Sequence, residues 1–330
     1  MAEFLTFDTD LTAVANAIRV KGGTSAQLIY PSGFVSAIQA IQTGITPKLV
    51  VTTTPGAAIT ATPAEGFKVV KGTAGADGMC TLELPKAGTW HVTAMANSVS
   101  NSQHIVIGTQ NMLLPLYHDT FANNTWEEII TVCRTGIAPD SWAVGDSKTM
   151  NIGGTAYQVD IIGKNHDEYA DGSGTAPLTF QLHDCYSEAK QMYSTNLSGL
   201  GWKNTDMRLT YLPAILALMP AEVQNGIHAV NKKTSEGGNS TTIETVSDTL
   251  FLLSEVEVFG TNRSSVPGEG IQYDYYKAGN PKIKKREGVD EFWWERSSAS
   301  GGMFCRVRDN GQAGTSNASN SLGVSFAFCF

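Results

Sequence analysis

The C-terminal segment, residues 303–330, decides the fold, and it reads MFCRVR, then DNGQAGTSNASNSL, then GVSFAFCF. MFCRVR and GVSFAFCF alternate between two sets of side chains, which is the pattern of β-strands, because successive residues of a strand point to opposite faces. In the last strand Val324, Phe326, Phe328 and Phe330 share one face, opposite small side chains. Since chain ends are commonly poorly ordered, this apolar ending predicts a terminus that is built into the core.

The middle of this segment, residues 309–322, has almost no large apolar side chain, and Ser297–Gly302 is similar in composition. A plain solvated loop is the usual interpretation of such a stretch. Here two apolar strands and the Trp293-Trp294 pair flank it, and a rigid scaffold that carries tolerant loops is a common way to build a binding surface. Ser, Gly and Asn with a few Arg offer adaptable hydrogen bonding, so the segment is a candidate contact surface.

Upstream of this segment, strands alternate with short helices. Residues 124–136, NTWEEIITVCRTG, predict a helix with Asn124 as its cap. The Gly-Gly pair within residues 148–163 predicts the turn of a β-hairpin. We expect further strands at LTFQLHD (178–184) and LFLLSEVEVFG (250–260), and helices at SEAKQMYS (187–194) and LPAILALMPAEVQNGIHAVN (212–231).

The N-terminal part contains two different units. Residues 1–45 predict two short amphipathic helices. A segment of this length is too short to enclose a core of its own, so the helices must pack on a partner, as an adaptor does. The apolar positions are Leu11, Val14 and Ile18 in the first helix and Phe34, Ile38 and Ile41 in the second. From residue 46 to 110 the period changes to two, and short strands follow at roughly 8–12-residue spacing, which is typical of a small β-sandwich.

Composition excludes several classes of protein. With 42% hydrophobic and 16% charged residues over 330 residues, the chain has ample apolar material for buried cores. The net charge is −8 and the one basic cluster is residues 282–286, so we expect no nucleic-acid binding. No window is apolar enough for a membrane span, and MAEFLTFDTD is not a secretory signal, so we expect folding in a cytoplasm. The five cysteines lack a C-x-x-C pair and are expected to be buried free thiols.

The sequence offers little for catalysis. His166-Asp167 and His183-Asp184 are His-Asp pairs that could bind a metal or relay protons, but a working site needs further groups that converge in space. Glu168 and Asp171 lack the spacing of a calcium loop. The motifs of nucleotide-binding loops, serine hydrolases and zinc proteases are also missing. We therefore expect no catalytic residue, no cofactor and no metal.

Several motifs resemble a known family. WEEIITVCRTG, WAVGDSKTMNIGGTAYQVDIIGKNHDE, LTFQLHDC, LLSEVEVFG and FWWERS, together with the C-terminal segment, are similar to phage and gut-bacterial proteins with a C-type-lectin fold. That fold is shared with formylglycine-generating enzymes and with the variable proteins of diversity-generating retroelements, such as the phage major tropism determinant. The resemblance covers about residues 120–330. AVANAIRVKGG and YPSGFVSAIQAI, near the start, resemble the N-termini of phage tail proteins.

The resemblance implies a multidomain α+β protein of the phage tail. Its parts would be a helical adaptor (1–45), an immunoglobulin-like spacer (46–110) and a C-type-lectin-fold, formylglycine-generating-enzyme-like domain (111–330). The implied function is a tail-tip or tail-fibre receptor-binding protein of the virion, whose partner is a host cell-surface protein or glycan. It would bind other tail proteins through the adaptor and form a homo-oligomer, with a trimer favoured. Two alternatives remain: a structural tail or baseplate component, and a bacterial surface adhesin.

In the retroelement family, mutagenesis rewrites codons in the last lectin-fold strands and their loops. Carried over by position, the implied variable and ligand-binding residues are Ser298, Ala299, Ser300, Gly301, Met303, Arg306, Arg308, Asp309, Gln312, Gly314, Thr315, Ser316, Ser319, Ser321 and Leu322. The implied scaffold residues are Trp293, Trp294, Phe304, Cys305, Val307, Gly311, Gly323, Phe326 and Cys329. The family ending usually reads GV-x-P-x-FC, and this chain departs from it at Ser325-Phe326.

Overall fold

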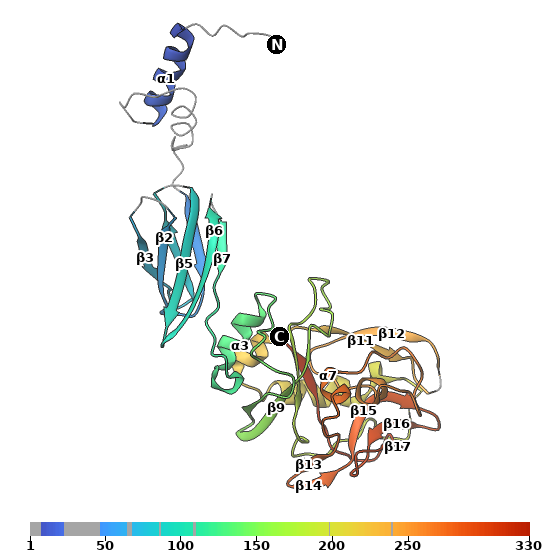
Figure 1. Cartoon of the computed structure of the whole chain (residues 1–330). Helices are drawn as coiled ribbons and strands as arrows, with labels where there is room; N and C mark the ends of the chain where they lie inside the picture. The colour runs from blue at the N-terminus through green and yellow to red at the C-terminus, as the bar shows by residue number, and fades with distance from the viewer. Residues whose placement is uncertain are drawn as a thin grey trace. The chain divides into compact units, whose positions relative to one another are not determined.

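The computed structural model describes residues 8–22, 47–64, 68–85, 87–107, 110–197, 199–238 and 240–330. The chain divides into two compact units, Met1–Leu114 and Pro115–Phe330 (Figure 1). Strands form several small sheets, and short helices accompany them in the second unit. The expectation of a multidomain α+β protein is therefore confirmed at that level.

The first unit begins with one helix, α1 (Asp8–Gly22). Its predicted apolar face is partly wrong, because Val14 is 48% exposed whereas Ala15 and Ile18 are buried. The buried stripe thus follows the i, i+3 spacing from Ala15, one helix position away from Val14. The second predicted helix, with Phe34, Ile38 and Ile41, lies outside the described residues.

Two sheets make up the rest of the first unit, in the orders β4-β1-β7 and β3-β2-β5-β6. The strands are β1 (Lys48–Thr52), β2 (Ala58–Pro63), β3 (Val70–Thr73), β4 (Met79–Glu83), β5 (Gly88–Ala96), β6 (Val99–Ile107) and β7 (Gln110–Leu113). Burial alternates along β1 and β5, where Leu49, Val51, Trp90 and Val92 are buried. Because β7 pairs in parallel with β1, the unit continues to Leu114, past the boundary expected at residue 110.

A four-stranded antiparallel sheet, in the order β18-β10-β9-β8, forms the centre of the second unit. Its strands are β8 (Ser147–Ile152), β9 (Thr155–Lys164), β10 (Leu178–Leu182) and β18 (Ala327–Cys329). The predicted hairpin is confirmed, since Gly153 and Gly154, at φ 57° and 86°, form the turn between β8 and β9. Two successive positive φ angles are the reason that this turn uses glycine.

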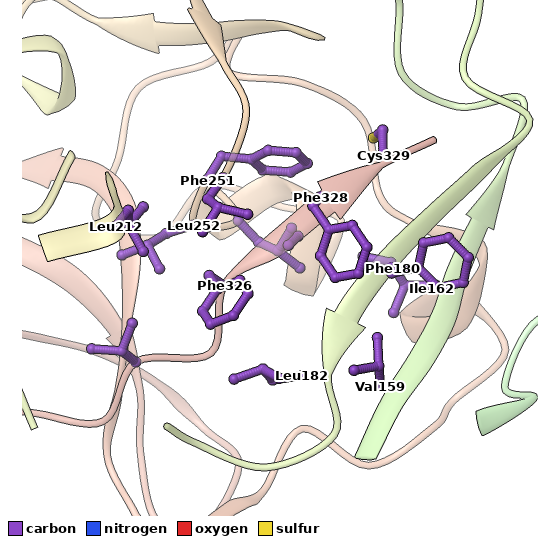
Figure 2. Close-up of a cluster of buried hydrophobic side chains, with 14 of the residues drawn as sticks. Val159, Ile162, Phe180, Leu182, Leu212, Phe251, Leu252, Phe326, Phe328 and Cys329 are labelled. Atoms are coloured by element: carbon purple, nitrogen blue, oxygen red, sulfur yellow. The ribbon is translucent and has the colours of Figure 1, made fainter. Parts of the chain in front are cut away.

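The C-terminal strand lies inside the hydrophobic core, as its sequence predicts. Phe180 of β10 stacks on Phe328 (Figure 2), with ring centroids 5.3 Å apart, and Phe330 is only 2% exposed. The small residues opposite the phenylalanines, including Cys329, are buried as well. The strand is covered on both sides and therefore carries no polar face.

Short helices surround the central sheet. They are α3 (Trp126–Cys133), α4 (Leu212–Leu216), α5 (Ala221–Gly226), α6 (Glu255–Phe259) and α7 (Asp274–Lys277), with the helical turns η1 (Phe121–Asn123), η2 (Trp202–Asn204) and η3 (Met207–Tyr211). The helix predicted at 124–136 is confirmed, but Thr125 caps it through a capping box with Glu128. Asn124 instead binds the backbone of His118.

Three other predictions for this unit are wrong or only partly right. Residues 212–231 are not one helix, because two short helices, α4 and α5, take its place and residues 230 and 231 begin a strand. Residues 250–260 are not one strand, because Ser254 and Glu257 form a capping box that starts α6. Residues 187–194 form no helix, and their backbone bonds instead to the C-terminal segment, with the Lys190 and Leu322 amides each donating to the carbonyl of the other. The remaining strands upstream of the last sheet are β11 (Val230–Ser235), β12 (Ile243–Asp248), β13 (Lys284–Arg286) and β14 (Val289–Glu291).

Candidate functional site

The last strands form a separate three-stranded antiparallel sheet, which we call the terminal sheet. It consists of β15 (Trp293–Ala299), β16 (Met303–Val307) and β17 (Ala313–Asn317), which lie side by side in the orange and red part of Figure 1. The interpretation of residues 309–322 as one loop is therefore wrong. β17 pairs through its backbone, so it needs no large side chains to form a strand.

The terminal sheet separates the predicted contact residues into three groups. Exposed residues are Ser300, Gly301, Arg308, Asp309, Gln312 and Ser321, and half-buried residues are Met303, Arg306, Gly314, Thr315 and Ser319. Four predicted contact residues are buried, namely Ser298, Ala299, Ser316 and Leu322. Ser298 turns inward and donates its hydroxyl to the carbonyl of Gly238. These four residues have almost no exposed surface for a partner to contact.

Strand β15 is anchored by tryptophans on both of its faces. Trp293 and Trp294 are fully buried, and their indole N–H groups donate to the carbonyls of Lys282 and Lys190 at 2.9 and 2.8 Å. Among the implied scaffold residues only Gly311 keeps part of its surface exposed. All five cysteines are free and buried, as the sequence predicts.

Arg296 joins β15 to three other segments. Its fully buried guanidinium donates to the carbonyls of Lys233, Leu252 and Glu269 and forms a two-pronged ion pair with Glu257. Bidentate pairing of this kind gives both energy and a fixed geometry. The cluster determines where the backbone of β15 lies, and sequence reasoning missed it because its acceptors lie far away in the chain.

A second buried cation extends this cluster. The Lys232 ammonium lies 2.7 Å from Asp167 and 2.8 Å from Glu257, and it also donates to the Tyr273 hydroxyl at 3.0 Å. Burial alone would raise the pKa of Asp167, but the charges of Lys232 and His166 and the hydrogen bonds from Lys232 and Thr179 together outweigh burial and hold that pKa at about 2. All three ammonium protons are used, so this group is a structural cross-link.

One buried carboxyl, that of Glu295, does not take part in the hydrogen bonds of the Arg296 cluster. Glu295 is fully buried, and neither of its oxygens has a hydrogen-bond partner in the described part of the chain. Burial, together with the nearby carboxylates of Glu255 and Glu269, raises its pKa well above the usual range. Burial therefore favours the protonated form of this side chain.

The two His-Asp pairs do not form dyads with their sequence neighbours. The Nδ1 atom of His183 lies 2.7 Å from Asp160, whereas Asp184 accepts the backbone N–H of Lys285. His166 stacks on Tyr273 with ring centroids 3.9 Å apart. Asp167 is occupied by Lys232, and among the described residues no three His, Cys, Asp or Glu side chains are placed to hold a metal ion.

The outer surface of the terminal sheet carries two arginines close together. Arg306 lies 4.0 Å above the centre of the Phe292 ring, and its Nε donates to the Thr315 carbonyl at 3.1 Å. Arg308 follows two residues later, on the same side of the strand. Gly314 lies directly opposite Arg306, and a Cβ at Gly314 would come within 2.8 Å of the Arg308 Nε and 3.6 Å of the Arg306 Nε. Both arginine side chains therefore pass over the bare backbone of Gly314.

A hollow lies elsewhere on the same unit, away from the terminal sheet. It encloses about 510 Å³ and is lined by Arg134, Tyr169 and His228, with the apolar side chains of Ile130 and Phe330. The rings of Tyr169 and His228 lie 5.0 Å apart. This volume is in the range of small-molecule sites, and none of the predicted contact residues lines it.

Comparison with known proteins gives one family. Residues 179–330 match the model of a domain of unknown function (DUF6273). The match covers less than half of the chain, and it includes β10, the Arg296 cluster and the whole terminal sheet. No curated protein and no solved structure matches the chain. No helix in the described ranges is both long and apolar enough to cross a membrane.

Proposed function

We propose that the chain is a receptor-binding protein of a phage tail tip or fibre, and that the exposed side of the terminal sheet binds a ligand on the host cell. The observation that carries this proposal is the contrast within one small sheet. Strand β15 is fixed by buried tryptophans and by Arg296, while the end of the neighbouring β16 presents two arginines among small polar residues. Rigid elements that carry adaptable polar groups are suited to recognition.

The sequence motifs support a finer assignment of the two units. The second unit would be a C-type-lectin fold of the kind found in formylglycine-generating enzymes and retroelement variable proteins. The two sheets of the first unit would be an immunoglobulin-like spacer, and residues 1–45 would attach the protein to other tail proteins. Several copies in one virion, as in a trimer, would strengthen attachment through avidity.

If the C-terminal codons are diversified, the structure limits which changes can alter binding. Substitutions at Ser300, Arg308, Asp309 and Gln312 would change the outer surface directly, because these side chains are exposed. Substitutions at the buried Ser298, Ala299, Ser316 and Leu322 would act through packing and stability. Diversity that is tolerated in a population should therefore concentrate at the exposed positions.

The proposal is tested by attachment of the fluorescently labelled full-length chain to candidate host cells. One variant carries Arg306→Ala, Arg308→Ala and Asp309→Ala, and a matched control carries Arg134→Ala and Glu222→Ala, which change exposed charged residues elsewhere on the same unit. We expect the first variant to lose attachment and the control to keep it, while both retain the circular dichroism spectrum of the parent chain.

The other outcomes distinguish this proposal from a binding site elsewhere on the unit and from a structural role. Equal attachment of both variants would place the site elsewhere, and loss in the control alone would point to the hollow around Arg134 and Tyr169. If neither variant nor the parent chain attaches to any host, even as an oligomerised form, the protein is better explained as a structural tail or baseplate component.

A further inference from the structure

We propose that the ligand of the terminal sheet is an acidic polysaccharide, and that one of its carboxylates binds between Arg306 and Arg308 above Gly314. This inference rests on the proposed function and names the chemical class of its receptor. Three observations carry it: the unused donors of the two arginines, their closeness to one another, and the polar character of the surface around them.

The first observation is the unused hydrogen-bonding capacity of the pair. Arginines in the described residues form ion pairs with carboxylates at Arg208, Arg286 and Arg296. Neither Arg306 nor Arg308 has a carboxylate within ion-pair distance there. Arg306 uses only its Nε, toward the Thr315 carbonyl. A guanidinium has five N–H donors arranged to grip a carboxylate with two parallel hydrogen bonds, so most donors of the pair face solvent.

The second observation is that the positive charges of Arg306 and Arg308 are held close together. Stacking on Phe292 and the hydrogen bond to Thr315 fix Arg306 in position. Partial burial, followed by the neighbouring Arg308, lowers the pKa of Arg306, and Asp309 offsets this only in part. Two positive groups that lie close together without a bound anion repel each other. A carboxylate placed between them would remove that repulsion.

The absence of a side chain at Gly314 makes room for this arrangement. A Cβ at this position would lie 2.8 Å from the Arg308 Nε and 3.3 Å from its Cγ. Any larger residue would push Arg308 aside and separate the two guanidinium groups. Gly314 therefore sets the geometry of the pair, although its backbone φ is not one that requires glycine.

The surroundings favour a carbohydrate over a protein as the bearer of the carboxylate. Protein interfaces obtain most of their affinity from a few hot-spot residues, which are enriched in Trp, Tyr and Arg and lie in well-packed central pockets. Within residues 298–322 no large apolar side chain is exposed, and the exposed side chains are Ser, Asn, Gln, Arg and Asp. Ile283, beside Gly311, is an exposed apolar residue at the margin. A surface of hydroxyls and amides matches the hydroxyl groups of sugars.

The test measures binding of the full-length chain to immobilised polygalacturonate and hyaluronate, which carry uronic acid carboxylates. Methyl-esterified polygalacturonate supplies the same backbone without charge, and polyglutamate supplies the charge on a peptide. We expect binding to at least one of the two acidic polysaccharides, little binding to the ester, and weaker binding as salt rises, because exposed ion pairs are screened.

Variants locate the site. Arg306→Gln with Arg308→Gln should weaken binding by at least about tenfold, since charge-assisted hydrogen bonds are the strong ones, and Arg263→Gln, at an exposed arginine elsewhere on the unit, should leave it unchanged. Gly314→Val should weaken binding with both arginines still present. Replacing both arginines with lysine should restore only part of the affinity, because lysine keeps the charge but loses the forked geometry.

Three results would overturn the inference. Binding to neither acidic polysaccharide would exclude this ligand class, and tighter binding to polyglutamate would favour an acidic protein. Equal losses in the Arg263→Gln control would show a general charge effect. If the arginine variants lose attachment to cells but no polysaccharide binds, only the ligand class is wrong. If they still attach normally, the proposed function of this surface fails as well.

Discussion

Arg296 and the Arg306–Arg308 pair belong to one small sheet but have opposite surroundings. Arg296 on β15 is fully buried and donates to three carbonyls and to both oxygens of Glu257. Arg306 is half-buried with one hydrogen bond, and Arg308 is exposed. A guanidinium whose donors are all used can only hold the protein together. One whose donors are free can bind something else, and the following predictions test that distinction.

The largest expected effect is on stability at the buried arginine. Arg296→Met should lower the free energy of unfolding by about 3–5 kcal/mol, because it leaves Glu257 facing Lys232 alone and removes donors from three carbonyls. Urea denaturation measures the loss. Arg308→Met, at the exposed position, should change stability by no more than about 0.5 kcal/mol. Similar losses at both positions would remove the distinction between the two regions.

The next largest effect is on the pH dependence of stability, and it concerns Glu295, the buried carboxyl next to Arg296 in the sequence. The pKa of Glu295 is raised in the folded state, so the folded protein holds this proton more tightly than the unfolded chain does. The stability of the parent chain should therefore fall as the pH rises above about 4.3, the usual glutamate value. Glu295→Gln removes the titration and should add on the order of 1–3 kcal/mol at pH 8, and close to nothing at pH 4.

The control for this prediction is Glu291→Gln, because Glu291 is partly exposed and forms an ion pair with Arg286. It should not show a gain that grows with pH. Thermal denaturation from pH 4 to pH 8 compares the two variants, and a gain for Glu295→Gln that stays constant with pH would contradict the buried-proton explanation.

A smaller effect is expected where Arg306 stacks on a ring. Arg306→Ala removes the contact with Phe292 and one hydrogen bond, and it should cost about 1 kcal/mol of stability. Arg306→Lys should recover less than half of this, because the planar stacking is lost. Denaturation midpoints for the two variants give the comparison, and full recovery by lysine would mean that stacking contributes little.

The smallest effect is at His183, away from both arginine regions. Its hydrogen bond to Asp160 raises the pKa of His183. The pair therefore stabilises the fold fully below about pH 6.5, the unfolded value, and this contribution is lost as the pH rises through the higher folded value. Because the imidazole is 53% exposed, His183→Gln should cost at most about 1 kcal/mol at pH 5.5 and clearly less at pH 8.5. An equal cost at both values would show that charge is not involved.

Local patterns in the sequence determined the elements whose causes are local. Glycines at 153 and 154 specified the hairpin of β8 and β9 because the turn needs two positive φ angles. The apolar ending specified a buried terminus, and Phe330 is buried. Where a competing local signal was overlooked, prediction failed: the apolar run at 250–260 contains the capping box of Ser254, which starts a helix.

The roles of the arginines were decided only by the tertiary structure. WERS and CRVR both place an arginine on an apolar strand next to small or polar residues, and nothing in either motif separates a buried residue from an exposed one. The acceptors of Arg296 come from Lys233, Leu252, Glu257 and Glu269, between 27 and 63 residues away in the chain. Side-chain periodicity specifies local backbone geometry, but the number of acceptors within reach of a guanidinium depends on which distant segments pack against it.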